Sequence, residues 1–272
     1  PPEQFAKLQK ELPGEVFTTR TLATYSYELN NKKAPFDNVN VRKALNLSLD
    51  RNVITDKVLG QGQTPTYVFT PTYIEEGQLI QQPAYSKEPM AQRNEEAIKL
   101  LEEAGYSKAN PLKFSILYNT NENHKKVAIA AASMWKANTK GLIDVKLENQ
   151  EWKTYIDSRR AGRYDAARAG WNADYNQATT FGNYFLSNSS NNTAKYANPE
   201  YDKAIAESYV ATDAEGRAKA YAKAEEILAK DFGIVPIFNY VNPRLVKPYV
   251  KGYSGKDPQD HIYLRNLYII KH

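Results

Sequence analysis

The sequence predicts an α/β fold with a mostly parallel or mixed sheet, because helix-like and strand-like segments alternate along the chain. Apolar residues recur at helical spacing in segments such as 94–104. Short runs rich in β-branched and aromatic residues separate the helices, as in 111–118 (PLKFSILY). With 272 residues, 42% of them hydrophobic, the chain can bury a core without disulfides or metals.

The N-terminal part combines one long strand with short helices. Helical apolar spacing followed by Pro-Gly or Gly marks the helices, and a Thr- and Tyr-rich run marks the strand. From the N-terminus we expect a helix over 3–12, a strand over 16–29, a helix within 35–50, a second helix from the capping residue Asp50 to Gly60, and a long loop over 61–93.

The rest of the chain alternates more regularly. Asn94 is expected to cap the next helix and Gly105 to end it. We expect helices over 94–104, 124–138, 152–161, 199–210 and 213–230, strands over 111–118, 143–147, 164–171, 234–241 and 245–250, and a last strand-like piece at the C-terminus.

Charge and composition narrow the functional classes. Lysine and arginine exceed aspartate and glutamate by 36 to 31, but they never form a basic run of five, so nucleic acid is not an expected partner. The 20 tyrosines offer amphipathic rings that suit recognition of varied ligands. No apolar run reaches the ~18 residues of a membrane span. The opening Pro1-Pro2-Glu3-Gln4 lacks a signal-peptide pattern, so we expect neither segment.

The motifs of common catalytic and metal sites are absent from the sequence. There is no cysteine, and His124, His261 and His272 lie far apart, so we expect no metal, no cofactor and no catalytic residue. An enzyme of the peptidase or glycosidase class could use the carboxylates of Asp165 and Asp174. Nothing in the sequence brings these two carboxylates together.

A group of residues in the middle of the chain indicates a binding site. Trp152 and Arg159 are seven residues apart on a predicted helix and share a face. Arg168 lies between two alanines in a predicted strand and precedes Gly170, so something must approach that backbone closely. Asp174 follows the strand's C-terminal end, where open α/β sheets hold ligands. The alternative is a structural Arg168–Asp174 ion pair on a solvated loop.

Five segments carry a family resemblance. The stretch 167–176 closely resembles the ligand-binding strand of the periplasmic oligopeptide-binding proteins, the solute receptors of bacterial ABC peptide importers. The matching segments are ARAGWNADYN (167–176), YELNNKKAPFDNVNVRKALNLSLDR (27–51), LYNTNENHKK (117–126), NQEWKTYIDSR (149–159) and VNPRLVKPYVKGY (241–253). The similarity runs over essentially the whole chain, including the final YIIKH.

The resemblance implies the fold of a type II periplasmic binding protein, a receptor whose two lobes close over a ligand. The chain corresponds to the C-terminal half of such a receptor. By this comparison residues 1–24 are the end of lobe I, 25–241 form lobe II, which binds peptide, and 242–272 return to lobe I. The chain should therefore expose apolar surface where the missing N-terminal half would pack.

The resemblance also implies a set of ligand-binding residues. Asp174 is similar to the carboxylate that pairs with the peptide α-ammonium, and Arg168 and His124 are similar to basic groups near the peptide C-terminus. Further implied ligand contacts lie in side-chain pockets or on the ligand-facing strand: Trp152, Arg159, Trp171, Tyr240, Gly170 and Ala169. Departures from the family pattern are visible: members often carry a cysteine pair where Ala23 and Asn172 stand here, Gly182 replaces a bulkier apolar residue, and Gln177-Ala178 replace a Glu-Pro.

The implied function is that of the solute-binding receptor of an ABC transporter, which captures short oligopeptides in extended form in the periplasm of a Gram-negative bacterium. Backbone pairing and the terminal charges of the peptide would hold the ligand. The implied partners are short peptides, the inner-membrane ABC permease complex and the N-terminal half of the receptor. The alternatives are a murein (cell-wall) peptide receptor, in which Arg159 meets an extra carboxylate, the enzyme described above, and a basic, Tyr-rich nucleic-acid binder.

Overall fold

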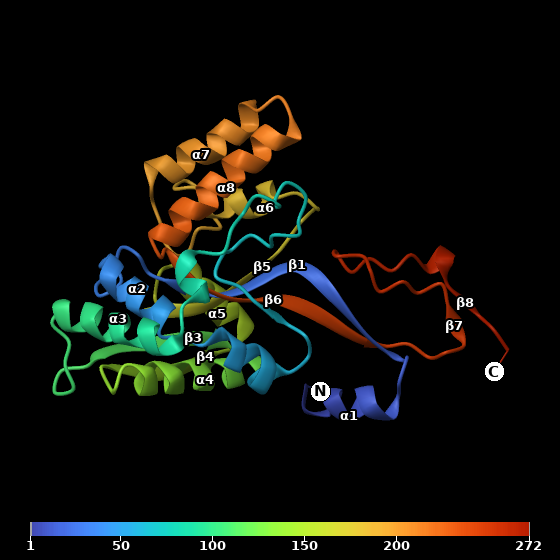
Figure 1. Cartoon of the computed structure of the whole chain (residues 1–272), viewed down its shortest axis with the longest axis horizontal. Coiled ribbons are helices and arrows are strands. Elements are labelled where there is room, and N and C mark those ends of the chain that lie inside the picture. Colours follow the sequence, from blue (N-terminus) through green and yellow to red (C-terminus); the bar gives the residue numbers. More distant parts are fainter. Residues whose placement is uncertain (1, 272) are drawn as a thin grey trace.

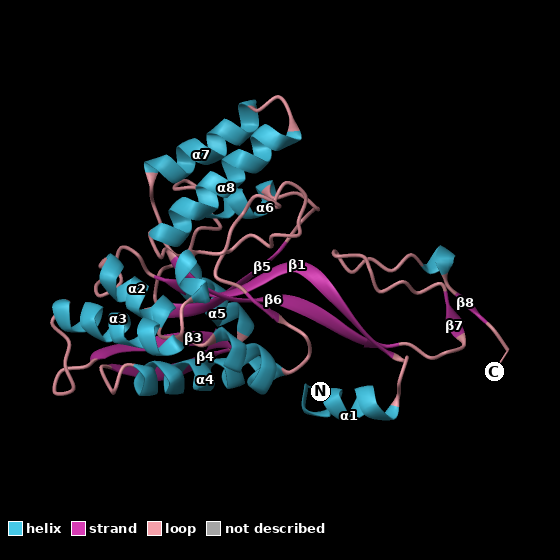
Figure 2. Cartoon of the chain, in the orientation of Figure 1, coloured by secondary structure: helices cyan, strands magenta, loops and turns pink. Residues whose placement is uncertain are grey.

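The computed structural model describes residues 2–271 and contains a six-stranded sheet with helices on both faces (Figures 1 and 2). His272 lies outside the described residues. The strands are β1 (Val16–Leu29), β2 (Thr64–Pro65), β3 (Leu112–Asn119), β4 (Ile143–Gln150), β5 (Ala166–Asn172) and β6 (Ile234–Leu245) in the order β2-β6-β1-β5-β3-β4, with β7 (Val250–Lys251) and β8 (Tyr268–Ile269) forming a separate ladder.

Most helices lie in the connections between these strands, and α1 precedes β1. The longer helices are α1 (Pro2–Glu11), α2 (Val39–Leu47), α3 (Met90–Glu103), α4 (Glu122–Asn138), α5 (Trp152–Arg160), α7 (Pro199–Val210) and α8 (Ala214–Lys230). The shorter ones are η1 (Val53–Leu59), η2 (Ala84–Lys87), α6 (Thr179–Gly182), η3 (Asn183–Phe185) and η4 (Leu264–Asn266). No helix within residues 2–271 is both long and apolar enough to cross a membrane.

The sheet is mixed, which confirms the predicted fold class. β3 pairs in parallel with β4 and β5, whereas β1 pairs antiparallel with β5 and β6. Ala23 and Asn172, the positions of the cysteine pair in the resembling family, are direct cross-strand neighbours. The parallel strands come from the alternating β-α-β-α region, because parallel neighbours need a crossover helix.

Each face of the sheet buries its own apolar core. One face, with Tyr25 and Tyr27 of β1, packs under α2, α3 and α4 in a cluster that includes Trp135. The other face packs against α6, α7 and α8 around Phe181 and Phe185. A smaller cluster centred on Tyr155 joins α5 to that second face. Because strand side chains alternate, adjacent residues of β1 and β5 belong to different cores.

Several expected boundaries differ from the structure. The helix α3 begins at Met90 with Pro89 as its cap, so the expectation that Asn94 caps it is wrong. The residues before Asn94 favour helix and bury Arg93, whose guanidinium donates to the Tyr67 hydroxyl. Asp50 does cap the following turn, but residues 53–59 are wound as a π-helix that ends at Gly60.

The strand β6 is longer than expected, because it continues to Leu245 instead of ending at Val241. Its last part pairs with the first residues of β1, from Val16 to Arg20. These two ribbons extend together away from the helices, toward α1 and the C-terminal segment (Figure 1). The expected final strand exists only as the two-residue β8.

The C-terminal segment exposes the apolar surface that the resemblance predicts. Its exposed large hydrophobic residues are Leu245, Ile262, Tyr263, Leu264, Tyr268, Ile269 and Ile270. Leu264 is 77% exposed and Ile269 is 69% exposed. Exposed apolar surface of this kind is common at interaction sites.

Candidate functional site

The strand β5 has a neighbour on both sides for only part of its length. β3 pairs with β5 at Ala166 and Ala167, whereas β1 pairs with β5 as far as Asn172. The second half of β5 therefore has a strand on one side only within the described part of the chain. Because α4 and α5 lie on opposite faces of the sheet, β3 and β5 separate at a topological switch point. Ligands of open α/β sheets bind at such points, outside the carboxyl ends of the strands.

The backbone of this open edge has hydrogen-bonding groups to offer. The N–H of Ala173 donates to the carbonyl of Leu22 in β1, which fixes the alternation of the antiparallel ladder. Arg168, Gly170 and Asn172 are consequently the residues whose backbone groups point away from β1. The carbonyl of Arg168 accepts from the Tyr155 hydroxyl. The groups of Gly170 and Asn172 face a side on which no described strand pairs with them.

Arg168 is a largely enclosed cation without an acidic partner. Its Nη2 donates to the Tyr240 hydroxyl at 2.6 Å, and its guanidinium carbon lies 5.1 Å from the centre of the Tyr25 ring. Its Nε is buried and has no hydrogen-bond partner. Among residues 2–271 Arg168 forms no salt bridge, so the alternative of an Arg168–Asp174 ion pair is wrong.

Gly170 lies where a side chain would crowd its neighbours. A Cβ at Gly170 would lie 3.2 Å from the Thr24 carbonyl oxygen and the Tyr240 hydroxyl, and 3.3 Å from the Arg168 guanidinium. The close approach predicted at this backbone is therefore made by the protein's own groups. Ala169 alternates to the opposite face and is 2% exposed, so its side chain does not share the surroundings of Arg168.

A cavity of about 540 Å³, the strand-end cavity, lies at the end of β5. Four of the predicted site residues line it: Trp152, Arg168, Gly170 and Tyr240. The remaining lining residues are Thr21, Leu22, Ala23, Asn172, Ala173, Asn242, Pro258, Gln259 and Asp260. The strand-end cavity thus joins the open edge of β5 to the bulged part of β1 and to the C-terminal segment.

Asp174 lies beside the strand-end cavity, on the turn that follows β5. Its side chain is exposed and accepts a hydrogen bond of 3.3 Å from Thr180 Oγ1. Its backbone carbonyl accepts from the Gln259 amide of the C-terminal segment. The carboxylate is therefore oriented, yet it has no cationic partner within the described residues.

His124 lies at the start of α4, next to a second cavity of about 320 Å³, the histidine cavity. Asn121 caps the helix by accepting from the backbone N–H of His124, which places the ring 5.5 Å from the Tyr25 ring. Burial and the nearby charge of Arg168 lower the pKa of His124 to about 3. Tyr240 lines both cavities, so the two predicted basic groups flank one aromatic cluster.

Arg159 lies away from both cavities, in an ion pair with Glu28. Its Nη2 forms a 2.9 Å ion pair with Glu28 and also donates to the Tyr184 and Thr193 hydroxyls. Trp152 stacks on Tyr155 with ring centroids 5.9 Å apart, and the Arg159 guanidinium lies over the same ring. The predicted shared helix face is therefore confirmed, but Arg159 lines neither the strand-end cavity nor the histidine cavity.

The other predicted residues also divide between the two faces. Trp171 packs edge-on against Tyr184 and donates from Nε1 to Thr180, on the face opposite Arg168. Asp165 lies at the far end of β5 from Asp174, where it pairs with Lys33 at 2.7 Å. Burial would raise the pKa of Asp165, but the bonds from Lys33 and the Ser115 N–H lower it. The carboxylate pair proposed for an enzyme is therefore not assembled.

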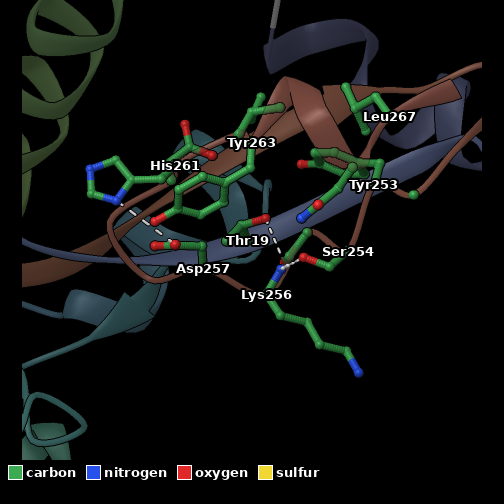
Figure 3. Close-up of a pocket in the computed structure, with 13 residues that line it drawn as sticks. Thr19, Tyr253, Ser254, Lys256, Asp257, His261, Tyr263 and Leu267 are labelled. Carbon is green, nitrogen blue, oxygen red and sulfur yellow. Dashed lines mark hydrogen bonds and ion pairs between the residues drawn. The ribbon is translucent and has the colours of Figure 1, made fainter.

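A separate small cavity of about 40 Å³ lies in the C-terminal segment (Figure 3). His261 reaches Asp257 there at 3.8 Å, and Thr19 donates to the Gly255 carbonyl. His261 and Asp257 alone are too few ligands for a metal site. Residues 2–271 contain no group of three His, Cys, Asp or Glu side chains that could hold a metal ion.

Sequence reasoning missed the residues that surround Arg168 and Arg159. Tyr25 and Tyr27 alternate with Ser26 and Glu28 in β1, so the four residues face two different cores. The alternation was visible in the sequence and predicts two faces. Which partner each face meets depends on contacts over more than a hundred residues, such as the contact between Glu28 and Arg159.

The fold and the site together define a mixed α/β unit with an open strand edge and a cavity at its end, an architecture typical of ligand-binding proteins. The profile of the bacterial extracellular solute-binding proteins, family 5 (middle region), matches residues 1–193. The chain therefore belongs to this family of solute-binding proteins.

Known members of the family match the chain from end to end. This chain is 96% identical over 272 residues to the periplasmic oligopeptide-binding protein OppA of Haemophilus influenzae. It is 44% identical to the periplasmic murein peptide-binding protein MppA of Escherichia coli. Both matches cover 100% of this chain and 50% of the relative, so the chain spans about half the length of the curated relatives it matches.

Solved structures agree with the fold. The crystal structure of Haemophilus influenzae OppA in complex with the peptide RPPGFSPFR matches with a TM-score of 0.93 and 95% identity, over 100% of this chain and 53% of that one. The structure of Escherichia coli MppA matches with a TM-score of 0.91 and 43% identity, again over 100% and 53% of the two chains. These matches confirm the fold of a periplasmic binding protein.

Proposed function

We propose that this chain is the peptide-binding lobe of a periplasmic receptor that captures oligopeptides in extended form for an ABC importer. The observation that carries the proposal is the open edge of β5, with an unpaired cation and an unpaired carboxylate beside it. Added strands bind to such edges through backbone hydrogen bonds, which every peptide can form whatever its side chains.

The two charges give the bound peptide a direction. Asp174 receives the α-ammonium at the C-terminal end of β5, and a short peptide's carboxylate approaches Arg168, so the ligand runs antiparallel to β5. The Arg168 guanidinium lies beside Gly170, four residues before Asp174. At about 3.3 Å per residue this span is roughly 13 Å, the length of a four-residue extended peptide.

Longer peptides would end beyond Arg168. The nonapeptide in the Haemophilus influenzae OppA complex has more residues than this span can hold. Arg168 therefore matters for ligands short enough to place their carboxylate near it, while Asp174 matters for all ligands with a free amino group. His124, Trp152, Gly170 and Tyr240 would line the space around the ligand.

The complete receptor would have a second lobe. We assign residues 1–24 and 242–272 to the lobe that is shared with the missing N-terminal half, and residues 25–241 to the peptide-binding lobe. The exposed apolar residues of the C-terminal segment support this division, because they need a covering surface. The relatives named periplasmic oligopeptide-binding proteins support a periplasmic location. A structure of a Borrelia burgdorferi relative described as an oligopeptide ABC transporter protein supports an ABC permease as partner.

Two of the alternatives lose support from side-chain contacts. In a murein peptide receptor Arg159 would meet an extra ligand carboxylate, but Glu28 already occupies it. In an enzyme Asp165 and Asp174 would act together, but they lie at opposite ends of β5. A binding role without catalysis is therefore the function we propose.

A cycle with Asp174 and the peptide N-terminus tests the proposal. In the complete receptor, Asp174→Ala should weaken binding of a free-amine tetrapeptide by about 2–5 kcal/mol, or roughly 30- to several-thousand-fold, because the ammonium loses its partner on lobe closure. Calorimetry should show that the N-acetylated peptide binds weakly to both proteins. If the effects of mutation and acetylation simply add, Asp174 does not hold the ammonium.

A further inference from the structure

Side chains around the Tyr25 ring, at and near the histidine cavity, carry buried polar atoms without a hydrogen-bond partner. The buried atoms without a hydrogen-bond partner include the hydroxyls of Tyr25 and Tyr27, Nδ1 of His124 and Nε of Arg168. The imidazole and the guanidinium approach the same Tyr25 ring, at 5.5 Å and 5.1 Å. Buried polar groups are nearly always paired, so these atoms keep hydrogen-bonding capacity that an entering group could use.

Besides burial, Arg168 on β5 is the charged group that lowers the pKa of His124. The neutral polar groups that line the histidine cavity are Tyr25 on β1, Tyr240 on β6, and Asn121, Asn123, Gln61 and Gln63. On α4 itself Glu122 and Lys125 are exposed, and Lys126 pairs with Glu3 of α1. No described acidic side chain lines the histidine cavity.

We propose that His124 takes up a proton from solvent when the carboxylate of a short peptide enters between it and Arg168, so that capture of such peptides is linked to proton binding. The inference rests on the proposed function and adds a pH dependence to it. An entering carboxylate offsets the charge of Arg168 and gives Nδ1 an acceptor, and both effects favour the imidazolium form.

The direction of the effect follows from linkage. Without ligand, burial and Arg168 keep the pKa of His124 near 3, so the ring is neutral at the pH of the periplasm. A carboxylate within about 4–6 Å raises such a pKa by about 1–3 units, to roughly 5. The complex then binds more protons than the free receptor, and affinity rises as the pH falls. Between pH 7 and pH 4.5 the expected gain is roughly fourfold.

The test compares peptides with and without a carboxylate. Calorimetry on the complete receptor measures trialanine, tetraalanine and pentaalanine, each as free acid and as C-terminal amide, at pH 7 and pH 4.5. Two buffers of different ionisation enthalpy report the protons taken up. Effects of pH at the ammonium end of the peptide are common to the acid and amide forms and cancel in the ratio of acid affinity to amide affinity.

We expect this ratio to rise roughly fourfold at low pH for at least one length, together with proton uptake. His124→Gln should abolish the rise, whereas His261→Gln, which removes a histidine of the C-terminal segment, should keep it. A ratio that is independent of pH for all three lengths overturns the linkage, and so does a rise that survives His124→Gln. If no free-acid peptide binds at pH 7, the proposed function fails and the linkage fails with it.

Discussion

Two arginines nine residues apart have opposite surroundings. Arg159 is held by the carboxylate of Glu28, which is fully buried and also accepts from Tyr184 at 2.7 Å. Arg168 projects from the opposite face of β5 toward Tyr240 and the Tyr25 ring, with no carboxylate among its described contacts. Nε has no hydrogen-bond partner in either residue, but the Arg159 guanidinium is part of a buried ion pair and the Arg168 guanidinium has no acidic partner among the described residues.

In the proposed function, the difference separates a structural charge, Arg159, from a binding charge, Arg168. Burying an ion is costly unless it is paired, so a protein keeps an unpaired one where a ligand completes it. The Glu28–Arg159 pair closes the second face of the sheet without leaving a charge for a ligand. Arg168 lines the strand-end cavity, and the proposed function places a peptide carboxylate beside it there.

The largest effect is expected from breaking the ion pair between Glu28 and Arg159. Glu28→Ala leaves Arg159 buried without its partner and should lower the free energy of unfolding by about 3–5 kcal/mol. Urea unfolding measures the loss. The matched control is Lys33→Ala, which breaks the exposed pair with Asp165 and should cost at most about 1 kcal/mol. Equal losses from the two variants would mean that Glu28 and Arg159 are not a buried pair.

Replacing Arg168 should affect peptide binding more than stability, in contrast to Glu28→Ala. Arg168→Met removes a charge that no acidic group matches, so the free energy of unfolding should stay unchanged or rise. Binding of a free-acid tetrapeptide should weaken roughly 10- to 100-fold, since charge-assisted hydrogen bonds contribute about 1.5–3 kcal/mol. Calorimetry with the C-terminal amide is the control, and its affinity should barely change. A large loss of stability would place Arg168 with Arg159 as a structural charge.

Local spacing predicted some of this organisation and missed the rest. The seven-residue spacing of Trp152 and Arg159 gave a shared helix face, because helix geometry is fixed over two turns. The role of each arginine depends on β1, whose residues Tyr27 and Glu28 point to opposite faces. Strand pairing over 130 residues decides which of them meets an arginine, and no local period encodes that register.

In the fold, too, local patterns predicted the separate elements, whereas features that depend on strand pairing were missed. Most helices and strands were predicted from periodicity and from glycine or proline at their ends. The length of β6 was not, because Pro243 suggests an interruption and only pairing with β1 shows that the strand continues. The separation of β3 from β5, which creates the open edge, is likewise a property of the assembled sheet.

The smallest expected effect concerns the hydroxyl that positions the unmatched cation. Tyr240→Phe removes the 2.6 Å bond to Arg168 while keeping the ring that lines both cavities. We expect a loss of about 0.5–1.5 kcal/mol in the free energy of unfolding, the usual contribution of one hydrogen bond. Affinity for a free-acid tetrapeptide should fall about two- to fivefold, because the guanidinium is less well oriented, while affinity for the amide stays constant. Tyr73→Phe is the matched control. It also removes a tyrosine hydroxyl, but this hydroxyl donates to the Thr21 carbonyl at 2.7 Å and does not bind an arginine. If Tyr240→Phe instead strengthens binding of the free acid, the hydroxyl competes with the ligand carboxylate for Arg168, and the cation is already partly satisfied before the peptide arrives.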